Sequence, residues 1–288
     1  MSGVIPQRSA SQIRETIAGW RAARDTIALV PTMGNLHAGH LSLASLAAEH
    51  TDRVILSIFV NPTQFGVGED FESYPRTLAE DRALIDGAGT VDALFAPEVS
   101  EIYPHGTEGA FTLRVPALGA ELCGALRPGH FDGVATVVLR LLNIVAPDLV
   151  VLGRKDYQQL IIIERMIADL RLPIGVVAGE TRRENDGLAI SSRNHYLTDE
   201  ERERAPLLHA ILRDVGEQLA SGERDYAALE QTAVARLTQS GFRPDYIEVR
   251  RAGDLGKPNG EHAPGELIVL GAAWLGRARL IDNLSVTL

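Results

Sequence analysis

The sequence predicts an α/β fold in which a doubly wound, Rossmann-like parallel sheet precedes a smaller C-terminal α+β domain. Over about the first 170 residues, short runs of apolar residues alternate with amphipathic helical segments. Strands that are apolar on both faces and alternate with helices are typical of a parallel sheet covered on both sides. After about residue 180 the chain becomes dense in charge and then β-like. We therefore expect one domain over residues 1–181 and a second over residues 182–288.

The elements of the first domain follow from apolar spacing. Ile13, Ile17 and Trp20 recur at helical intervals and predict a helix over 11–23. A run from Thr26 to Val30 predicts a buried strand that ends at Pro31. The further strands predicted are 53–60, 91–96 and 149–152, with an edge or hairpin strand at 111–115. Further helices are predicted at 39–50, 132–145 and 157–171. One more helix is predicted to start at a capping box, Thr77–Glu80, and to run to about Ile85.

The second domain is predicted from caps and short β-like runs. Thr198–Glu201 has the capping-box pattern and starts a helix, and a further helix is predicted at 225–239. The β-like segments that follow are 246–250, 267–274 and 279–282.

Composition limits the class of protein. Of 288 residues, 45% are hydrophobic and 23% are charged, which is typical of globular proteins. The net charge of −10 disfavours a nucleic-acid or anionic-membrane partner, although a few local cations can still hold one small anion. Cys123 is the only cysteine, so an intramolecular disulfide is impossible. With no signal-peptide pattern and no apolar stretch near the roughly 20 residues that span a bilayer, we expect a cytoplasmic protein.

The first polar junction follows the strand at 26–30. Gly34 and Gly39 bracket His37 and His40 where a strand turns into a helix. A helix N-terminus attracts anions, glycine lets the backbone approach a phosphate, and imidazoles can donate to its oxygens. An isolated His-x-x-His pair would favour a plain turn or a metal pair. The flanking Pro-Thr-Met-Gly and the strand-to-helix position favour an anion site here.

Three more junctions carry polar groups. Asn61 and Gln64 follow the strand at 53–60 and can orient a hydroxyl or carboxylate ligand, although Asn-Pro is also a common turn. Gly153–Gln159 places cations after the strand at 149–152, for phosphate contact or as ordinary surface charge. Ser191–Arg193 can wrap phosphate oxygens or be a solvated loop, and Arg182 and Arg183 lie nearby. Together the four junctions favour a nucleoside triphosphate cleaved between its α and β phosphates. A GxxxxGK[ST] loop is absent from the sequence, which disfavours P-loop phosphoryl transfer.

These residues resemble a known family. The His37–His40 and Ile190–Arg193 loops resemble the paired signatures of the nucleotidylyl-transferase superfamily, which includes class I aminoacyl-tRNA synthetases. Longer stretches are similar to the pantoate–β-alanine ligase family. They occur in order from about residue 25 to the C-terminus and are 30–37, 57–62, Tyr74–Thr77, Arg127–Phe131, Lys155–Gln159, Ser191–Asn194 and 273–276.

The resemblance implies a two-step reaction. ATP and (R)-pantoate, with Mg²⁺, give pantoyl adenylate and pyrophosphate, and the amine of β-alanine then displaces AMP to give pantothenate. Charge develops on the leaving pyrophosphate, where fixed donors stabilise a transition state. The catalytic residues implied are His40 as proton donor, His37, Lys155 and Arg193.

The resemblance also implies binding residues. Gln64 and Gln159 would hold pantoate, and Gln64 would also border β-alanine. The residues implied for ATP are Met33, Gly34, Asn35, Leu36, His37, Ala38, Gly39, His40, Gly153, Arg154, Lys155, Asp156, Arg182, Ile190, Ser191, Ser192 and Arg193.

The sequence departs from the family pattern at three positions. Arg154 stands where Glu is usual, Thr63 where Met is usual, and Arg182 where an apolar residue near adenine is common. Side-chain roles at Arg154 and Arg182 are therefore open. The metal ligands are unknown: Glu80 and Asp81 are candidates, and a plain pair on a helix face is an equal alternative.

Assembly and competing functions complete the expectations. The resemblance implies a homodimer, for which the apolar strand Val54–Phe59 with nearby helices is a candidate face. Residues 182–288 are expected to form a lid that excludes water from the adenylate. The alternatives are a nucleotidyltransferase that leaves the nucleotide on its product, an aminoacyl-tRNA synthetase, or a nucleotide-binding regulator without catalysis. Release of AMP and pyrophosphate with pantoate and β-alanine distinguishes them.

Overall fold

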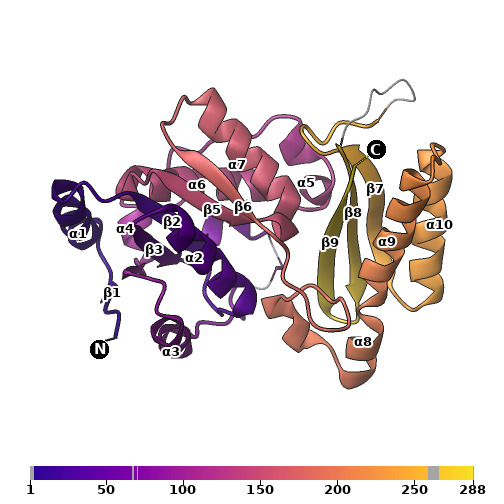
Figure 1. Ribbon diagram of the computed structural model, residues 1–288, viewed down its shortest axis with the longest axis horizontal. Coiled ribbons are helices and arrows are strands. Elements are labelled where there is room, and N and C mark those ends of the chain that lie inside the picture. The colour runs from indigo at the N-terminus through magenta and orange to yellow at the C-terminus, as the bar shows by residue number, and fades with distance from the viewer. Residues whose placement is uncertain (1–2, 67, 70, 259–265, 288) are drawn as a thin grey trace. The chain divides into compact units, whose positions relative to one another are not determined.

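The computed structural model describes residues 3–66, 68–69, 71–258 and 266–287 and divides into two compact units. The first unit is Met1–Arg154 with Ile162–Glu180, and the second is Lys155–Ile161 with Thr181–Leu288. The predicted fold class is confirmed: the first unit is a parallel α/β sheet and the second a smaller α+β unit (Figure 1). The sequence did not indicate that Lys155–Ile161 belongs with the C-terminal unit.

The sheet of the first unit is parallel throughout. Its strands lie in the order β1-β4-β3-β2-β5-β6. The strand bounds are β1 Pro6–Gln7, β2 Ile27–Thr32, β3 Arg53–Ile58, β4 Ala93–Phe95, β5 Leu149–Gly153 and β6 Gly175–Gly179. From β2 the chain moves outward in one direction to β3 and β4, then returns past β2 to β5 and β6. The order of strands therefore reverses between β2 and β5.

Helices cover both faces of this sheet. Their bounds are α1 Ala10–Ala22, α2 Ala38–His50, α3 Leu78–Ala88, α4 Val99–Ile102, α5 Cys123–Leu126, α6 His130–Val145 and α7 Tyr157–Asp169. Right-handed crossovers put α2 and α3 on one face and α1, α6 and α7 on the other (Figure 1). Central residues such as Leu29, Ile55 and Val150 are fully buried, as continuous apolar strands require.

Four local predictions for this unit were wrong or incomplete. Residues 111–115 form no strand, because the N–H groups of Leu113 and Val115 donate instead to Thr136 Oγ1 and Asp132 Oδ1 of α6, at 2.9 and 2.8 Å. Thr77 precedes α3 but makes no side-chain cap bond, so the predicted capping box is absent. β2 continues through Pro31, which lacks an N–H but still pairs with Ser57 of β3. β1 and β6 were not predicted.

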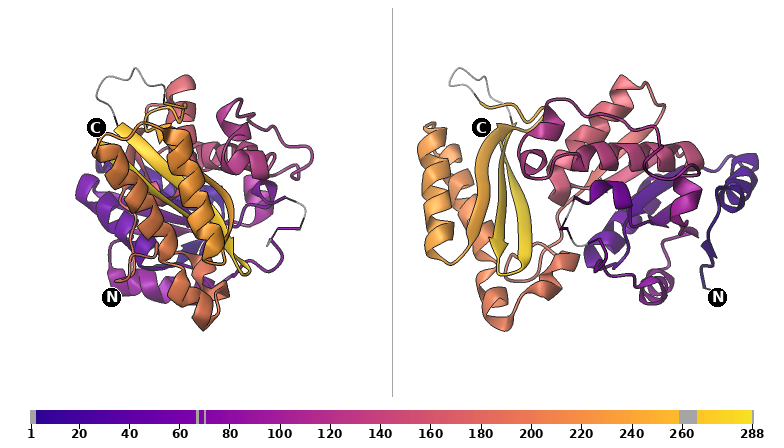
Figure 2. Two further views of the ribbon diagram at one scale, coloured as in Figure 1. Left: turned by 90° about the vertical axis from the view of Figure 1, so that its right-hand side faces the viewer. Right: turned by 180° about the vertical axis from the view of Figure 1, so that it is seen from behind.

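The second unit is a three-stranded antiparallel sheet with two helices on one face. The strands β7 Arg243–Arg251, β8 Glu266–Leu275 and β9 Ala278–Thr287 lie in that order. Helices α9 Leu207–Ala220 and α10 Tyr226–Gln239 pack against them (Figure 2). The short helix α8 Asp199–Arg204 has the predicted capping box, with Thr198 and Glu201 bonded reciprocally. Helix α9 was not predicted.

Two further expectations concern surfaces. In the described part of the chain, no helix is long and apolar enough to cross a membrane. The strand proposed as a dimer face is an interior strand: β3 is paired on both edges by β2 and β4, and Val54, Ile55 and Leu56 are buried. That placement of the dimer face was wrong, because apolarity of a central strand reflects the sheet core.

Candidate active site

The reversal of strand order places the carboxyl ends of β2 and β5 side by side, and a predicted polar junction begins at the end of each strand. β2 and β5 are neighbours, and their carboxyl ends lead into Met33–His37 and into the turn η3 Arg154–Asp156. In open α/β sheets, ligands bind outside the carboxyl ends of strands at such a switch point. The first unit therefore presents the histidine loop and Gly153–Arg154 at the position where this fold binds ligands.

The histidine loop is held by a buried carboxylate. Asp81 of α3 accepts from the backbone N–H groups of Asn35 and Leu36, at 3.1 and 2.7 Å. Gly34 adopts φ +82°, and a Cβ there would lie 3.0 Å from Asp81 Oδ2, so glycine suits both the conformation and the space. Burial raises the pKa of Asp81 above its ordinary 3.8, against the opposing effect of the Leu36 and Asn35 hydrogen bonds.

Asp81 is also one of the two candidate metal ligands. Its two oxygens accept backbone N–H groups and also lie 3.3 Å from Thr77 Oγ1. Among residues 3–66, 68–69, 71–258 and 266–287, no group of three His, Cys, Asp or Glu is arranged to hold a metal ion. The contacts of Asp81 make it an anchor of the histidine loop.

The two histidines face each other at the start of α2. His37 is the N-cap, and its Nδ1 accepts from the N–H of Gly39 at 3.2 Å. Because Nδ1 is the acceptor, the proton of the neutral ring is on Nε2, which can donate to a ligand. The His37 and His40 rings stack with centroids 4.0 Å apart. A Cβ on Gly39 would lie 2.9 Å from His37 Cε1, which explains the glycine.

The polar pair after β3 is buried and connected to the histidine loop. Asn61 is 1% exposed and donates from Nδ2 to Gln64 Oε1 at 3.1 Å and to the carbonyl of Gly133 at 3.2 Å. Gln64 Nε2 lies 3.1 Å from Met33 Sδ. Asn61 Oδ1 accepts from Tyr103 Oη and Thr63 Oγ1, so the unusual Thr63 takes part in this network. The structure therefore brings together Met33, Asn61 and Gln64, from two predicted junctions.

A chain of side chains fixes the Gln64 backbone. Glu69 binds Arg127 through two bonds of 2.7 and 2.6 Å, and Arg127 Nη1 lies 2.9 Å from His130 Nε2. His130 Nδ1 lies 2.8 Å from the carbonyl of Gln64. Since arginine only donates and a carbonyl only accepts, these contacts fit a His130 ring whose Nε2 accepts and whose Nδ1 donates. Burial would raise the pKa of Glu69, but bonding to Arg127 outweighs it and lowers that pKa.

Helix α6 lies directly on this segment. A Cβ on Gly133 would lie 2.4 Å from the carbonyl oxygen of Thr63 and 2.8 Å from Gln64 Cα, closer than atoms can approach. Gly133 is thus required for the backbone of Thr63–Gln64 to sit against α6.

At the end of β5, Arg154 stands where the family pattern has Glu, and it forms an ion pair with Glu180. Its Nε lies 3.3 Å from Glu180 Oε1, in a pair whose side chains are 37% and 82% exposed. Exposed pairs of this kind contribute little stability. The ion pair between Arg154 and Glu180 is therefore expected to contribute little to the stability of the fold.

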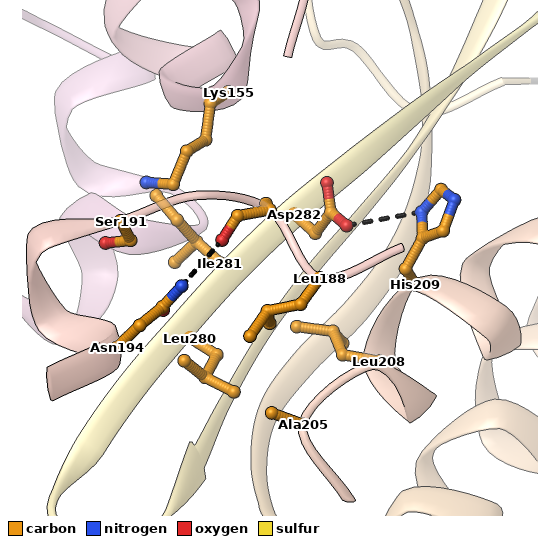
Figure 3. A pocket seen from close by; sticks show the side chains of 11 residues that line it. Lys155, Leu188, Ser191, Asn194, Ala205, Leu208, His209, Leu280, Ile281 and Asp282 are labelled. Carbon is orange, nitrogen blue, oxygen red and sulfur yellow. Dashed lines mark hydrogen bonds and ion pairs between the residues drawn. The ribbon is translucent and has the colours of Figure 1, made fainter. Parts of the chain in front are cut away.

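The second unit carries the remaining predicted residues. Lys155 and Ser191 line one small pocket together with Asn194, His209 and Asp282 (Figure 3). Ser191 caps the turn η4 Ser192–Tyr196, in which Ser192 and Arg193 lie. Arg182 is exposed, and its carbonyl accepts from the N–H of Ile190 at 2.9 Å. Gln159 lies on α7, two residues into the helix and half-buried.

Sequence reasoning missed several residues that shape these sites. Gly133, Asp282 and Asn283 carried no recognisable pattern, because their importance depends on contacts made across the fold. Arg127 and His130 did carry a signal, since they lie in one of the stretches similar to the family, but their link to Gln64 was not predictable.

Comparison with known proteins gives a consistent result. Residues 6–285 match the family model described as pantoate-beta-alanine ligase. The chain is 53% identical over 280 residues to the pantothenate synthetase of Alkalilimnicola ehrlichii, covering 96% of each chain, and 55% identical to that of Thioalkalivibrio sulfidiphilus, covering 93% of each.

Two solved structures agree over nearly the whole chain. The pantothenate synthetase of Thermus thermophilus is similar with a TM-score of 0.86 and 43% identity, over 97% of this chain and 98% of that one. The pantoate-beta-alanine ligase of Francisella tularensis, complexed with beta-gamma ATP and beta-alanine, has a TM-score of 0.81 and 33% identity, over 98% and 97%.

Proposed function

Because the chain belongs to the pantoate-beta-alanine ligase family, we propose that it forms pantothenate from (R)-pantoate and β-alanine through a pantoyl adenylate. ATP is the second substrate of the first step, and pyrophosphate and AMP are released in turn. The observation that carries the proposal is the histidine loop at the switch point of the sheet, where His37 caps the N-terminus of α2 and its ring stacks on that of His40. The nucleotide-bound relative from Francisella tularensis supports ATP as substrate.

In the proposed first step, the pantoate carboxylate attacks the α-phosphorus of ATP and pyrophosphate leaves. His40 and His37 donate to phosphate oxygens as charge develops, and the N-terminal end of α2 contributes its dipole. Lys155 and Arg193 are assigned to the same phosphates. The rest of the ATP assignment stays as the sequence predicts it, on Met33–Gly39, Gly153, Arg154, Asp156, Arg182 and Ile190–Ser192.

The proposed acyl site includes Gln64. Its amide is held by Asn61 and lies beside Met33, so it is oriented before any substrate binds. Gln64 and Gln159 are assigned to pantoate, and Gln64 also to β-alanine. An amide suits this task, since it can donate to a carboxylate and accept from a hydroxyl or ammonium.

Mg²⁺ is proposed to arrive with ATP. Magnesium is commonly bound through substrate phosphates with few protein ligands. Asp81 does not fit as a ligand because its oxygens accept from the histidine loop. No protein residue is therefore assigned to the metal, whose contribution would be to offset phosphate charge.

Isotope exchange tests the proposed function. With ATP, Mg²⁺ and pantoate present, labelled pyrophosphate should enter ATP without β-alanine, because a discrete adenylate makes the first step reversible by itself. Cys123 lies at the start of α5, and its motif shows no sign of an acyl acceptor, which favours the adenylate over a thioester. Exchange that needs β-alanine, or that proceeds without pantoate, contradicts the proposal.

Small-angle scattering tests two accompanying proposals, the lid and the homodimer. The division into two compact units supports a lid formed by residues 182–288, and family membership supports the dimer. ATP plus pantoate should lower the radius of gyration, and the forward scattering should give twice the 31.1 kDa of one chain. An unchanged profile contradicts closure, and a mass of one chain at micromolar concentration contradicts the dimer.

A further inference from the structure

We propose that Asp282 and Asn283 of β9 are positioning residues. They hold two segments of the second unit, Lys155 and Ser191–Arg193, in fixed positions relative to each other. The inference rests on the proposed function, since it assigns Lys155 and Ser191–Arg193 to ATP phosphates. Neither Asp282 nor Asn283 is expected to touch a substrate. Both act through the backbone or side chain of other residues.

Asp282 is the centre of a buried ionic cluster. Its side chain is 3% exposed, and it accepts two bonds from Arg183, at 2.6 and 2.8 Å. His209 Nδ1 of α9 lies 3.3 Å from Asp282 Oδ2 (Figure 3). Burial would raise the pKa of Asp282, but bonds from His209 and Arg183 outweigh it and lower that pKa. The carboxylate is therefore kept charged.

Arg183 connects this cluster to the serine–arginine loop. It forms an antiparallel bridge with Ala189, and its Nη1 also donates to the carbonyl of Gly187 at 3.1 Å. The segment between them is a tight hairpin that leads straight into Ser191, the cap of the turn containing Arg193. A bidentate arginine–carboxylate pair has defined geometry as well as energy. Asp282 thereby fixes where this hairpin, and the loop after it, lies against β9.

Asn283 connects the same strand to the lysine segment. Its side chain is buried, and Nδ2 donates to the carbonyl of Lys155 at 3.0 Å. The N–H of Asn283 in turn donates to Asp282 Oδ1 at 2.8 Å. Two adjacent residues of one strand thus bind two segments that are far apart in sequence.

The strand that carries both residues is well placed to act as a rigid reference. β9 pairs with β8 from Ala278 to Thr287 without a register shift. Lys155 and Arg193 have long side chains with many rotamers, so fixing the backbone beneath them reduces the entropy lost when they bind phosphate. If Asn283 positions Lys155, its substitution should slow the first chemical step only when Lys155 is present. A loss of stability alone should not produce the same slowing.

The test is pyrophosphate exchange in Asn283→Ala, Lys155→Ala and the double variant. Asn283→Ala should lower the exchange rate constant about 10-fold, the effect of losing one hydrogen bond of roughly 1.4 kcal/mol. In the Lys155→Ala background the same change should have less than about a twofold effect, because interacting residues are not additive. Arg183→Lys, which keeps the charge and loses the two-pronged geometry, should raise the KM for ATP.

Asp225→Ala is the matched control. Asp225 caps α10 of the same unit by accepting from the N–H of Ala228 at 3.0 Å, and this bond involves neither segment. It should lower the melting temperature and leave the exchange rate at 25 °C unchanged. The inference is overturned if Asn283→Ala exchanges like the wild type, if its loss is the same with and without Lys155, or if Asp225→Ala reproduces it. Lack of exchange in the wild type would instead refute the proposed function.

Discussion

Replacing His40 by alanine is expected to slow the proposed first step, formation of the pantoyl adenylate, about 10²–10³-fold, the usual cost of removing one transition-state donor. The ring stacks on His37 in the first turns of α2, so a single donor is lost without disturbing the strand or the Asp81 anchor. Alanine is a good helix former, and α2 should remain intact. Single-turnover measurement of pyrophosphate release with pantoate gives the rate.

Equilibrium binding of ATP separates a catalytic from a ground-state role. Affinity should fall far less than the rate, because a group that acts on developing charge contributes little before the reaction. Asn35→Ala would not be a clean control, since Asn35 adopts φ +50° in the same loop. Ser45→Ala on the same helix is suitable, since its Oγ bonds the carbonyl of Leu41 within the helix. A His40→Ala enzyme with full turnover and weakened ATP binding would show a ground-state ligand.

Gly133→Ala is expected to destabilise the protein by about 1–3 kcal/mol and to raise the KM for pantoate. The added Cβ meets the Thr63 carbonyl, so either α6 or the Thr63–Gln64 backbone must move. The same shift disturbs Asn61, which bonds the Gly133 carbonyl. Urea unfolding gives the free energy, and initial rates at saturating ATP give the KM.

Gly19 is a matched control, because the same substitution there is expected to change the stability in the opposite direction. Gly19 lies within α1, is exposed, and has nothing within 4 Å of the position of an added Cβ. Gly19→Ala should therefore stabilise the protein by about 0.5–1 kcal/mol, through lower entropy of the unfolded chain. If both variants change stability in the same direction, steric contact at Gly133 is not the cause.

The sequence predicted best what depends on local pattern. The helix expected at 39–50 is Ala38–His50, and the strand expected at 149–152 is Leu149–Gly153, because apolar periodicity and flanking glycine determine them. The strand–histidine–helix junction was likewise predicted, and it lies at the reversal of strand order.

What the sequence could not predict depends on distant partners. The side chains of residues 111–115 alternate as in a strand, yet the N–H groups of Leu113 and Val115 bond to side chains of α6 that lie some twenty residues later. Asp81 was weighed as a metal ligand because a carboxylate pair is ambiguous by itself. Only the fold shows that its acceptors are used by Asn35 and Leu36. Asn283 gave no signal, since a buried amide is recognisable only from the carbonyl it binds.

The discontinuous second unit has a consequence for how this chain can be inherited or divided. Lys155–Ile161 packs with Thr181–Leu288, so the backbone passes between the units three times, after Arg154, Ile161 and Glu180. A gene fragment that starts at Thr181 would encode the whole β7–β9 sheet but neither the lysine segment nor the carbonyl that Asn283 binds. The C-terminal unit is therefore not an exchangeable module: recombination that preserves its core would have to carry a piece of the preceding domain with it.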